Sequence, residues 1–134
     1  MIYLLDTNTC ISYLNGRSDS IRRRFEATRP QDIVVCSVVK AELFYGALKS
    51  RNPVTNLAKQ RRFLGRFVSL LFDDLAAEAY GRIRARLEQA GQLIGPNDLL
   101  IAAIAVAHQV TLVTHNTREF QRVEGLQIDD WEAS

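Results

Sequence analysis

The 134-residue sequence predicts a single α/β domain, residues 1–134, with a mainly parallel central sheet of four to five strands and helices on both faces. Short apolar segments alternate with segments of helical periodicity, a pattern typical of parallel sheets that are buried on both sides. Hydrophobic residues make up 47% of the chain, enough to form a core without disulfide staples.

Turn and capping residues divide the N-terminal half into five elements. Ser18 is a favourable N-cap, Pro30 ends the helix that follows it, and Ser37 is expected to cap the next helix. Gly16 is expected to end the first helix. The elements expected here are strand 2–5, helix 7–16, helix 18–30, strand 32–37 and helix 38–50.

The C-terminal half is divided in the same way. Pro53 opens a helix, Asp73 or Asp74 caps the next one, and Gly91 ends it. Apolar spacing predicts that one face of this second helix is buried, formed by Ala76, Tyr80, Ile83, Leu87 and Ala90. The remaining elements are expected as strand 68–72, helix 94–109, strand 110–114, a helical turn at 116–123 and an edge strand at 126–131.

Cysteine usage and apolar run length favour a cytoplasmic protein. Cys10 and Cys36 both lie in apolar segments, as reduced thiols that pack like small hydrophobic residues do. Asp6 interrupts the apolar start too early for a signal peptide. The longest apolar run, 99–107, is too short to span a bilayer, so no membrane association is expected.

Positive charge is carried mainly by arginine. The net charge is only +2, but most of the 17 basic residues are arginines, in clusters at 22–24, 61–66 and 82–86. Arginine binds phosphate through two parallel hydrogen bonds and stacks on bases. The clusters therefore fit a nucleic-acid partner, although solvated helix faces carry such charges as well.

An acidic residue begins the most apolar helix of the chain. Every residue from Leu99 to Ala107 is apolar, yet Asn97 and Asp98 occupy the first turn. An unpaired buried carboxylate is costly, although an acid in the first turn also complements the helix dipole. We expect this helix to hold Asp98 rigidly toward a cation, with Asn97 fixing the turn or the carboxylate.

Three further acids fall near strand ends. Asp6 follows the first strand, Glu42 lies in the helix after the second, and Glu119 follows the fourth strand. Each alone has an ordinary explanation as a cap or a solvated residue. In parallel sheets, however, ligand sites lie beyond the carboxyl ends of the strands, and these acids are expected to converge there with Asp98.

Such an arrangement of acids predicts a metal site. Three carboxylates about 5 Å apart repel by roughly 3 kcal/mol per pair at an effective dielectric constant near 20, so a positive group is needed among them. Oxygen ligands without matching Cys or His favour Mg²⁺ or Mn²⁺ over zinc.

Four motifs make the chain similar to PIN-domain ribonucleases, in the same order and spacing: LLDTNTCISYL, SVVKAELFYGA, GQLIGPNDLLIAAIAV and LVTHNTREF. Over essentially all its length the chain resembles VapC-type toxins of bacterial VapBC toxin–antitoxin pairs. The resemblance implies a PIN-like three-layer sandwich and a Mg²⁺- or Mn²⁺-dependent endoribonuclease.

The resemblance also assigns roles to residues. The catalytic and metal-binding acids carry over to Asp6, Glu42 and Asp98. Many members have a fourth acid two residues after the threonine of strand four, where this chain has Asn116. Glu119, one helical turn later, is the candidate replacement. The residues expected to support the acids are Thr7, Asn8, Asn97, Thr114 and Asn116.

Substrate and partners are implied by the same resemblance. The substrates are structured RNAs, mostly tRNA, and toxins with the THNxxEF pattern resemble those that cut initiator tRNA in its anticodon stem-loop, which inhibits translation. A VapB-type antitoxin, a homodimer and contact with DNA only through the antitoxin are expected. Aromatic residues on arginine-bearing helices form the partner groove or are simply core: Phe25, Phe44, Phe63 and Phe67.

Competing interpretations remain at this stage. A haloacid-dehalogenase-like phosphatase requires a second Asp where this chain has Asn8, and a receiver domain requires an acidic pair that is missing. A non-catalytic RNA-binding PIN fold stays open, against which the intact acids count. His115 is the one candidate acid–base histidine, whereas His108 is expected to be structural.

Overall fold

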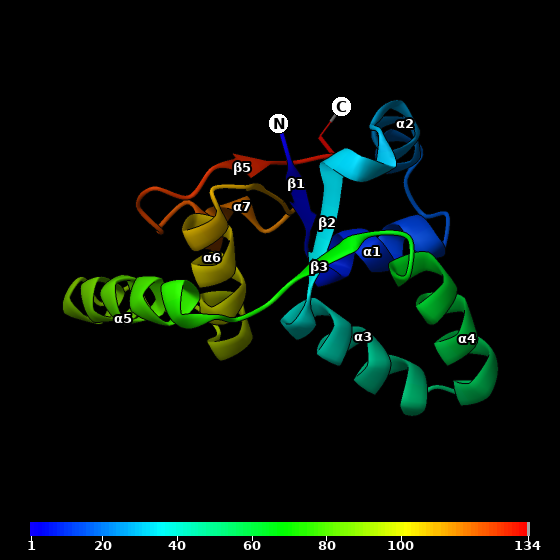
Figure 1. The fold of residues 1–134 in the computed structure, drawn as a ribbon, viewed down its shortest axis with the longest axis horizontal. Coiled ribbons are helices and arrows are strands. Elements are labelled where there is room, and N and C mark those ends of the chain that lie inside the picture. The colour runs from blue at the N-terminus through cyan, green and yellow to red at the C-terminus, as the bar shows by residue number, and fades with distance from the viewer. Residues whose placement is uncertain (134) are drawn as a thin grey trace.

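The computed structural model describes residues 1–133 and shows a five-stranded, all-parallel sheet with strand order β3-β2-β1-β4-β5 (Figure 1). β1 is central, and its Tyr3 and Leu4 pair with Ile33 and Val34 of β2 on one side and with Thr111 and Leu112 of β4 on the other. The strands are β1 (Tyr3–Leu5), β2 (Ile33–Cys36), β3 (Val68–Leu70), β4 (Thr111–Val113) and β5 (Ile128–Asp129).

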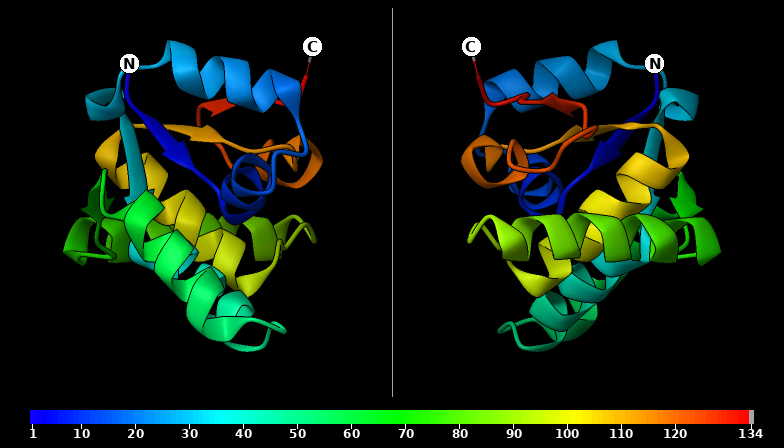
Figure 2. Two further views of the ribbon diagram at one scale, coloured as in Figure 1. Left: turned by 90° about the vertical axis from the view of Figure 1, so that its right-hand side faces the viewer. Right: turned by 90° about the vertical axis from the view of Figure 1, so that its left-hand side faces the viewer.

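Helices link the strands, as the alternation of apolar segments predicts. They are α1 (Thr7–Leu14), α2 (Asp19–Ala27), α3 (Ser37–Leu48), α4 (Pro53–Leu64), α5 (Asp74–Gln89), α6 (Pro96–His108) and α7 (Thr117–Phe120), with a short 3₁₀ helix at Pro30–Asp32. Figures 1 and 2 place α6 between the sheet and α5, and α2 on the opposite side of the sheet. The predicted three-layer α/β architecture is confirmed.

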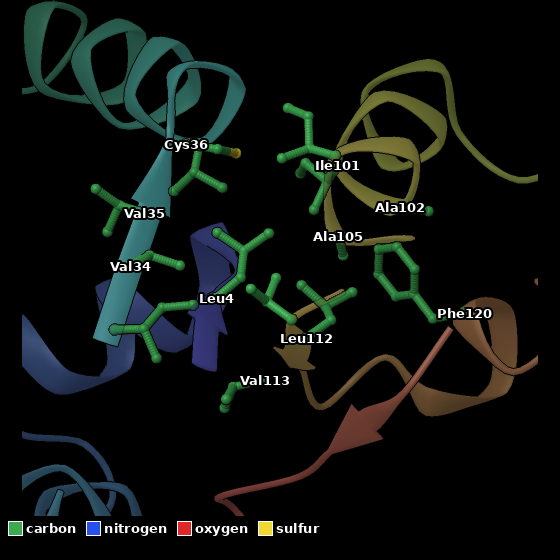
Figure 3. Close-up of a cluster of buried hydrophobic side chains, with 14 of the residues drawn as sticks. Leu4, Val34, Val35, Cys36, Ile101, Ala102, Ala105, Leu112, Val113 and Phe120 are labelled. Atoms are coloured by element: carbon green, nitrogen blue, oxygen red, sulfur yellow. The ribbon is translucent and has the colours of Figure 1, made fainter. Parts of the chain in front are cut away.

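One face of the sheet packs on α6. Leu4 and Leu112 of the central strands are fully buried, and Ile101 and Ala105 of α6 point toward them (Figure 3). Phe120 of α7 closes this cluster from the side. Because α6 is buried along most of its length, its first turn is held firmly in place over the sheet.

The opposite face packs on α2 and the C-terminal segment. Side chains alternate along a strand, so Tyr3 points away from Leu4 and α6. The Tyr3 ring meets the buried Trp131 ring edge-on at 5.4 Å, and the Arg24 guanidinium of α2 lies 5.5 Å from the Trp131 ring. The Ser20 hydroxyl donates to the Trp131 carbonyl at 2.6 Å, which fastens the segment after β5 against α2.

The aromatic residues of the arginine-bearing helices belong mainly to the core. Phe25, Phe63 and Phe67 are buried and Phe44 is partly buried. The Phe25 ring lies 4.0 Å from that of Tyr13, and the Phe63 ring lies 5.3 Å from that of Phe67. The structure therefore supports the core alternative rather than an aromatic partner groove.

Three local expectations are wrong. Ser37 is the first residue of α3, and Cys36 occupies the N-cap position without a side-chain bond. β3 ends at Leu70 rather than Phe72, because β2 ends at Cys36, the partner of Leu70. Ala90 is exposed at the end of α5, where the helix has passed beyond the core, and Ala79 is buried instead.

Among residues 1–133, no helix combines the length and the apolar character needed to cross a bilayer. The two cysteines, Cys10 and Cys36, are buried free thiols.

Candidate active site

Asp6 occupies the point where the central strand β1 turns into α1. Its carboxylate caps α1 by accepting from the Thr9 backbone N–H at 2.8 Å, and its own backbone N–H donates to the Val113 carbonyl at 3.1 Å. The side chain is only 6% exposed. This turn is therefore fastened both to its own helix and to the neighbouring strand β4.

The environment of Asp6 raises the pKa of its carboxyl above the ordinary value. Burial is the largest cause, and the nearby Glu42 acts in the same direction, whereas hydrogen bonds from Thr114 and Thr9 oppose the rise. Thr114 is fully buried directly after β4, and its hydroxyl also accepts from the Asn116 backbone N–H at 3.0 Å. Thr114 thus links Asp6 to the loop that leads to α7.

Glu42 reaches the same edge from α3. The Thr7 hydroxyl donates to Glu42 Oε1 at 2.7 Å, across 35 residues of sequence. Because Thr7 directly follows Asp6, this bond brings two of the predicted acids to neighbouring positions. Thr7 is one of the residues predicted to support the acids, and its hydroxyl contacts one of them.

Asp98 lies in the first turn of α6, partly buried. Burial raises its pKa to about 6, and the negative charges of Glu42, Glu119 and Asp6, in that order, add to the rise. The carboxyls of Glu42, Glu119 and Asp6 therefore lie close enough to Asp98 for their charges to act on it.

Gly95 and Thr9 lie beside the acids. A Cβ atom added to Gly95 would meet Asp98 Oδ2 at 3.4 Å, an ordinary van der Waals contact. Sequence reasoning missed Thr9, whose backbone N–H binds Asp6. The Asp-x-x-Thr spacing of an N-capped helix could have indicated Thr9.

Two expected supporting residues lie outside this group. Asn8 and Asn97 are both exposed, and neither side chain has a hydrogen-bond partner within residues 1–133. Asn116 contacts Thr114 through its backbone rather than its amide. The prediction that Asn97 fixes the turn or the carboxylate therefore finds no contact that supports it.

His115 is an ion-paired residue on the loop after β4. Its Nδ1 lies 3.0 Å from Asp130 Oδ2 and 3.2 Å from Glu132 Oε2, and its side chain is 66% exposed. The hydrogen bond and charge of Asp130, then the charge of Glu132, raise the pKa of His115. Both carboxylates favour the protonated ring, which argues against a role as general base.

The chemistry of the four acids fits a hard divalent cation. All of them offer oxygen, and their mutual repulsion would be relieved by a positive ion. The thiols of Cys10 and Cys36 lie near Asp6 and Glu42, but burial raises the pKa of both and keeps them protonated, so neither suits a thiolate ligand.

The acids are nevertheless not in direct contact as a set. Within the described residues 1–133, the group of three ligand atoms that all lie within 4.8 Å of one another belongs to His115, Asp130 and Glu132. Asp6, Glu42 and Asp98 are thus positioned by their own helices and hydrogen bonds rather than by one another.

Comparison with known proteins identifies the family. The PIN domain family matches residues 3–126. The chain is 42% identical to the tRNA(fMet)-specific endonuclease VapC of Shigella flexneri, over 96% of this chain and 97% of that protein. It is 41% identical to ribonuclease VapC2 of Rickettsia felis, over 98% of this chain and 99% of that protein.

A solved structure extends this similarity to three dimensions. The VapBC2 complex of Rickettsia felis, bound to a DNA fragment from its promoter, superimposes with a TM-score of 0.91 at 41% identity and covers 98% of this chain and 99% of that chain. The full-length similarity, the all-parallel sheet and the acids at its carboxyl edge all point to the same family. The chain belongs to the VapC ribonuclease toxins of VapBC toxin–antitoxin systems, within the PIN domain family.

Proposed function

We propose that this ribonuclease is a Mg²⁺- or Mn²⁺-dependent endonuclease that cuts structured RNA, namely tRNA, in which Asp6, Glu42 and Asp98 are the catalytic acids. The observation that carries the proposal is the convergence of carboxylates from separate elements. Burial, together with the charges of the other acids, raises the pKa of Asp98 to about 6. PIN nucleases generally use divalent metal ions, and an all-oxygen donor set suits these two.

Each acid would hold the ion from a different rigid element. Asp6 is oriented by Thr9 and Thr114, Glu42 by Thr7, and Asp98 by the buried helix α6. A divalent ion bound there supplies a Lewis acid that activates water and offsets charge at the phosphorus. Glu119 is the fourth acid in this proposal, in place of the family acid missing at Asn116.

The reaction adds one water across the bond between phosphorus and the 3′ oxygen. The water oxygen becomes part of a 5′-phosphate, and its proton ends on the departing 3′-hydroxyl. His115 is not required, in keeping with its ion pairs to Asp130 and Glu132.

Within the class of tRNA substrates, we propose initiator tRNA as the specific substrate. The support is the 42% identity to the Shigella flexneri protein, whose name specifies tRNA(fMet), together with the THNxxEF pattern in this chain. Sequencing the 5′ ends of RNAs after induction of the protein would test it, with one dominant cut expected in the anticodon stem-loop.

We further propose a VapB-type antitoxin as partner, with DNA contacted through that antitoxin, as the Rickettsia felis complex suggests. A groove of about 220 Å³ between α1, α3 and α4 reaches Glu42 and offers apolar walls to an antitoxin segment, from Ile11, Leu14, Leu43 and Ala47. Copurification with the product of a neighbouring short reading frame would support this partner. Failure of the protein to bind any such product would contradict it.

A homodimer is the proposed state of the toxin itself. Val68 of the edge strand β3 is an exposed apolar residue, as are Leu71, Phe72 and Leu75, which follow it in the sequence. Sedimentation at micromolar concentration tests the dimer, and a monomer there would contradict it.

The central experiment is metal-dependent cleavage by purified protein. RNA should be cut with Mg²⁺ or Mn²⁺ and left intact in EDTA, and Asp98→Asn should remove the activity without changing the circular dichroism spectrum. RNA binding without cleavage under all these conditions would instead support a non-catalytic PIN-fold RNA-binding module.

A further inference from the structure

A hollow of about 350 Å³ lies between the C-terminal half of α5 and the segment after α7, and it has no part in the proposed cleavage chemistry. The charged residues of this arginine hollow are three arginines and one acid: Arg82, Arg86, Arg122 and Glu124. Its lining therefore carries a formal charge of +2, as much as the net charge of the whole chain. An excess of positive charge as large as that of the entire molecule is thus gathered in one hollow.

Helical spacing separates the arginines of α5 into two groups. Arg82 and Arg86 are four residues apart and share the face that lines the hollow. Arg84 lies on another face, where its Nε donates to Glu88 Oε1 at 2.8 Å. Arg82, in contrast, forms no ion pair with any of residues 1–133. The charge of Arg84 is therefore compensated within the helix, whereas that of Arg82 is free for a ligand.

Arg122 connects the hollow to the acidic edge of the sheet. Its backbone N–H donates to the Glu119 carbonyl at 3.1 Å, and its Nη1 donates to the Leu93 carbonyl at 3.3 Å. Leu93 lies in the loop that leads into α6 and Asp98. Within the described part of the chain, the Arg122 guanidinium forms no ion pair. The hollow therefore places a second free cation beside the two segments that carry Glu119 and Asp98.

The apolar floor of the hollow is already covered. Ile83, Leu87 and Val123 are at most 9% exposed, and arginine side chains lay their stems along such surfaces while their charged groups reach water. A protein segment would find little apolar surface here to bury, although the core of a protein interface depends on such burial. Guanidinium groups instead suit phosphate oxygens, which accept their two parallel hydrogen bonds.

We propose that the arginine hollow holds the phosphate backbone of the RNA substrate on the flank of the acidic site, with Arg82 and Arg122 as the phosphate-binding residues. The proposal rests on the proposed RNA cleavage. Glu124 forms an ion pair with Arg86 and repels phosphate, so it opposes the two free arginines. Contacts to phosphate position an RNA without reading its bases, so this surface acts on all sequences alike.

Binding is measured by fluorescence anisotropy on labelled RNA stem-loops of two unrelated sequences, in EDTA and at several salt concentrations. The variants are Arg82→Gln, Arg122→Gln, Arg122→Lys and Glu124→Gln. Two matched controls, Arg84→Gln and Glu88→Gln, alter the ion pair on the other face of α5. A third control, Arg51→Gln, removes an exposed arginine in the turn between α3 and α4, on the opposite side of Figure 1 from α5.

Arg82→Gln and Arg122→Gln should each weaken the binding of both RNAs by up to about 5-fold at low salt, and lower the salt slope of binding by about 1. Arg122→Lys keeps the charge and should keep the slope. Glu124→Gln releases Arg86 and removes a repulsive charge, so it should strengthen binding. Loss of a merely structural contact would not strengthen it. The three controls should bind both RNAs as the wild type does.

Cleavage kinetics separate a binding surface from the reacting centre. In single-turnover reactions with Mg²⁺, Arg82→Gln and Arg122→Gln should require more protein to reach the maximal rate. The maximal rate itself should stay unchanged, because contacts to distant phosphates are the same in the ground state and in the transition state. A lower maximal rate with unchanged binding would overturn the proposal.

Two further results would also overturn it. One is equal RNA binding by Arg82→Gln, Arg122→Gln and Arg51→Gln, or weaker binding by Glu124→Gln. The other is normal RNA binding by the arginine variants together with lost copurification of the neighbouring short reading frame's product, which would identify a protein docking surface. If no RNA is cut under any condition but the binding pattern in EDTA holds, the proposed cleavage fails while the phosphate-binding surface stands.

Discussion

Asp6 and Asp73 occupy the same local structure in two regions of the molecule, yet only one of them sits in an acidic site. Both are N-caps whose Oδ1 accepts from the backbone N–H three residues later, at 2.8 Å for Asp6 and 2.9 Å for Asp73. Asp6 is 6% exposed and has Glu42 nearby, whereas the side chain of Asp73 is 40% exposed and lies 3.2 Å from His108.

The difference shows that an aspartate cap carries no functional information by itself. At Asp73 the Nε2 atom of the His108 ring lies 3.2 Å from the carboxylate. At Asp6 further carboxylates face it, and burial raises its pKa. What separates a structural cap from a candidate metal ligand is therefore the sign and burial of the neighbours, which the following predictions test.

The largest expected effect is on activity. Asp6→Asn should lower RNA cleavage at least about 100-fold, because the carboxylate charge is lost at the reacting centre. Asp73→Asn should leave cleavage unchanged. Asparagine caps helices as well as aspartate does, so both variants should remain folded. Full activity of Asp6→Asn, in a preparation free of host nuclease, would contradict the assignment.

The second effect is on stability in the presence of metal. Mg²⁺ at a hundredfold excess over its dissociation constant should stabilise the wild type by about 2.7 kcal/mol, because it binds the folded state. Asp98→Asn should gain much less, and Asp73→Asn should gain as much as the wild type. Urea unfolding with and without Mg²⁺ measures the difference, and an equal gain in all three proteins would place the ion elsewhere.

The smallest effect is on the pH dependence of the metal-free protein. The folded pKa of Asp98 is about 6, above the unfolded value near 3.9. Its contribution to stability is therefore complete below the unfolded value and is lost as pH rises through about 6. In EDTA the wild type should gain up to about 1 kcal/mol between pH 7 and pH 5, less where solvent screens this partly exposed group.

Asp98→Asn provides the control for this pH effect. It should show a flatter pH profile and, at pH 7 in EDTA, a higher melting temperature than the wild type. If the variant instead melts lower and responds to Mg²⁺ as the wild type does, Asp98 is only a helix-dipole residue, equivalent in role to Asp73.

The positions of the strands along the sequence were predictable because they depend on short, strongly apolar segments, whereas the strand order in the sheet was not predicted. Leu4, Val35 and Leu112 lie in such segments and form the centre of the sheet. Strand lengths were less predictable, since β3 stops where its partner β2 stops and the sequence of β3 alone does not show this. β5 is similarly reduced to Ile128–Asp129 within the expected segment 126–131.

The positions of Asp6 and Glu42 near one edge of the sheet were also predictable, since both residues follow parallel strands. Contacts that depend on the third dimension were not. The Thr7–Glu42 hydrogen bond joins residues 35 positions apart, and the ion pairs of His115 come from the C-terminal segment. Predicting these contacts requires knowing how the elements are placed relative to one another, and sequence periodicity does not determine this placement.

The burial of α6 has a consequence for the choice of substrate. Asp98 is carried by a helix that is packed along most of its length, and Asp6 is held by bonds to α1 and β4, so these two acids have little freedom to move toward a ligand. If the proposed RNA substrate binds here, the RNA is the partner that deforms. Cutting rates should then follow how easily a loop opens, and base changes in a stem that touches no residue should alter cleavage through flexibility alone.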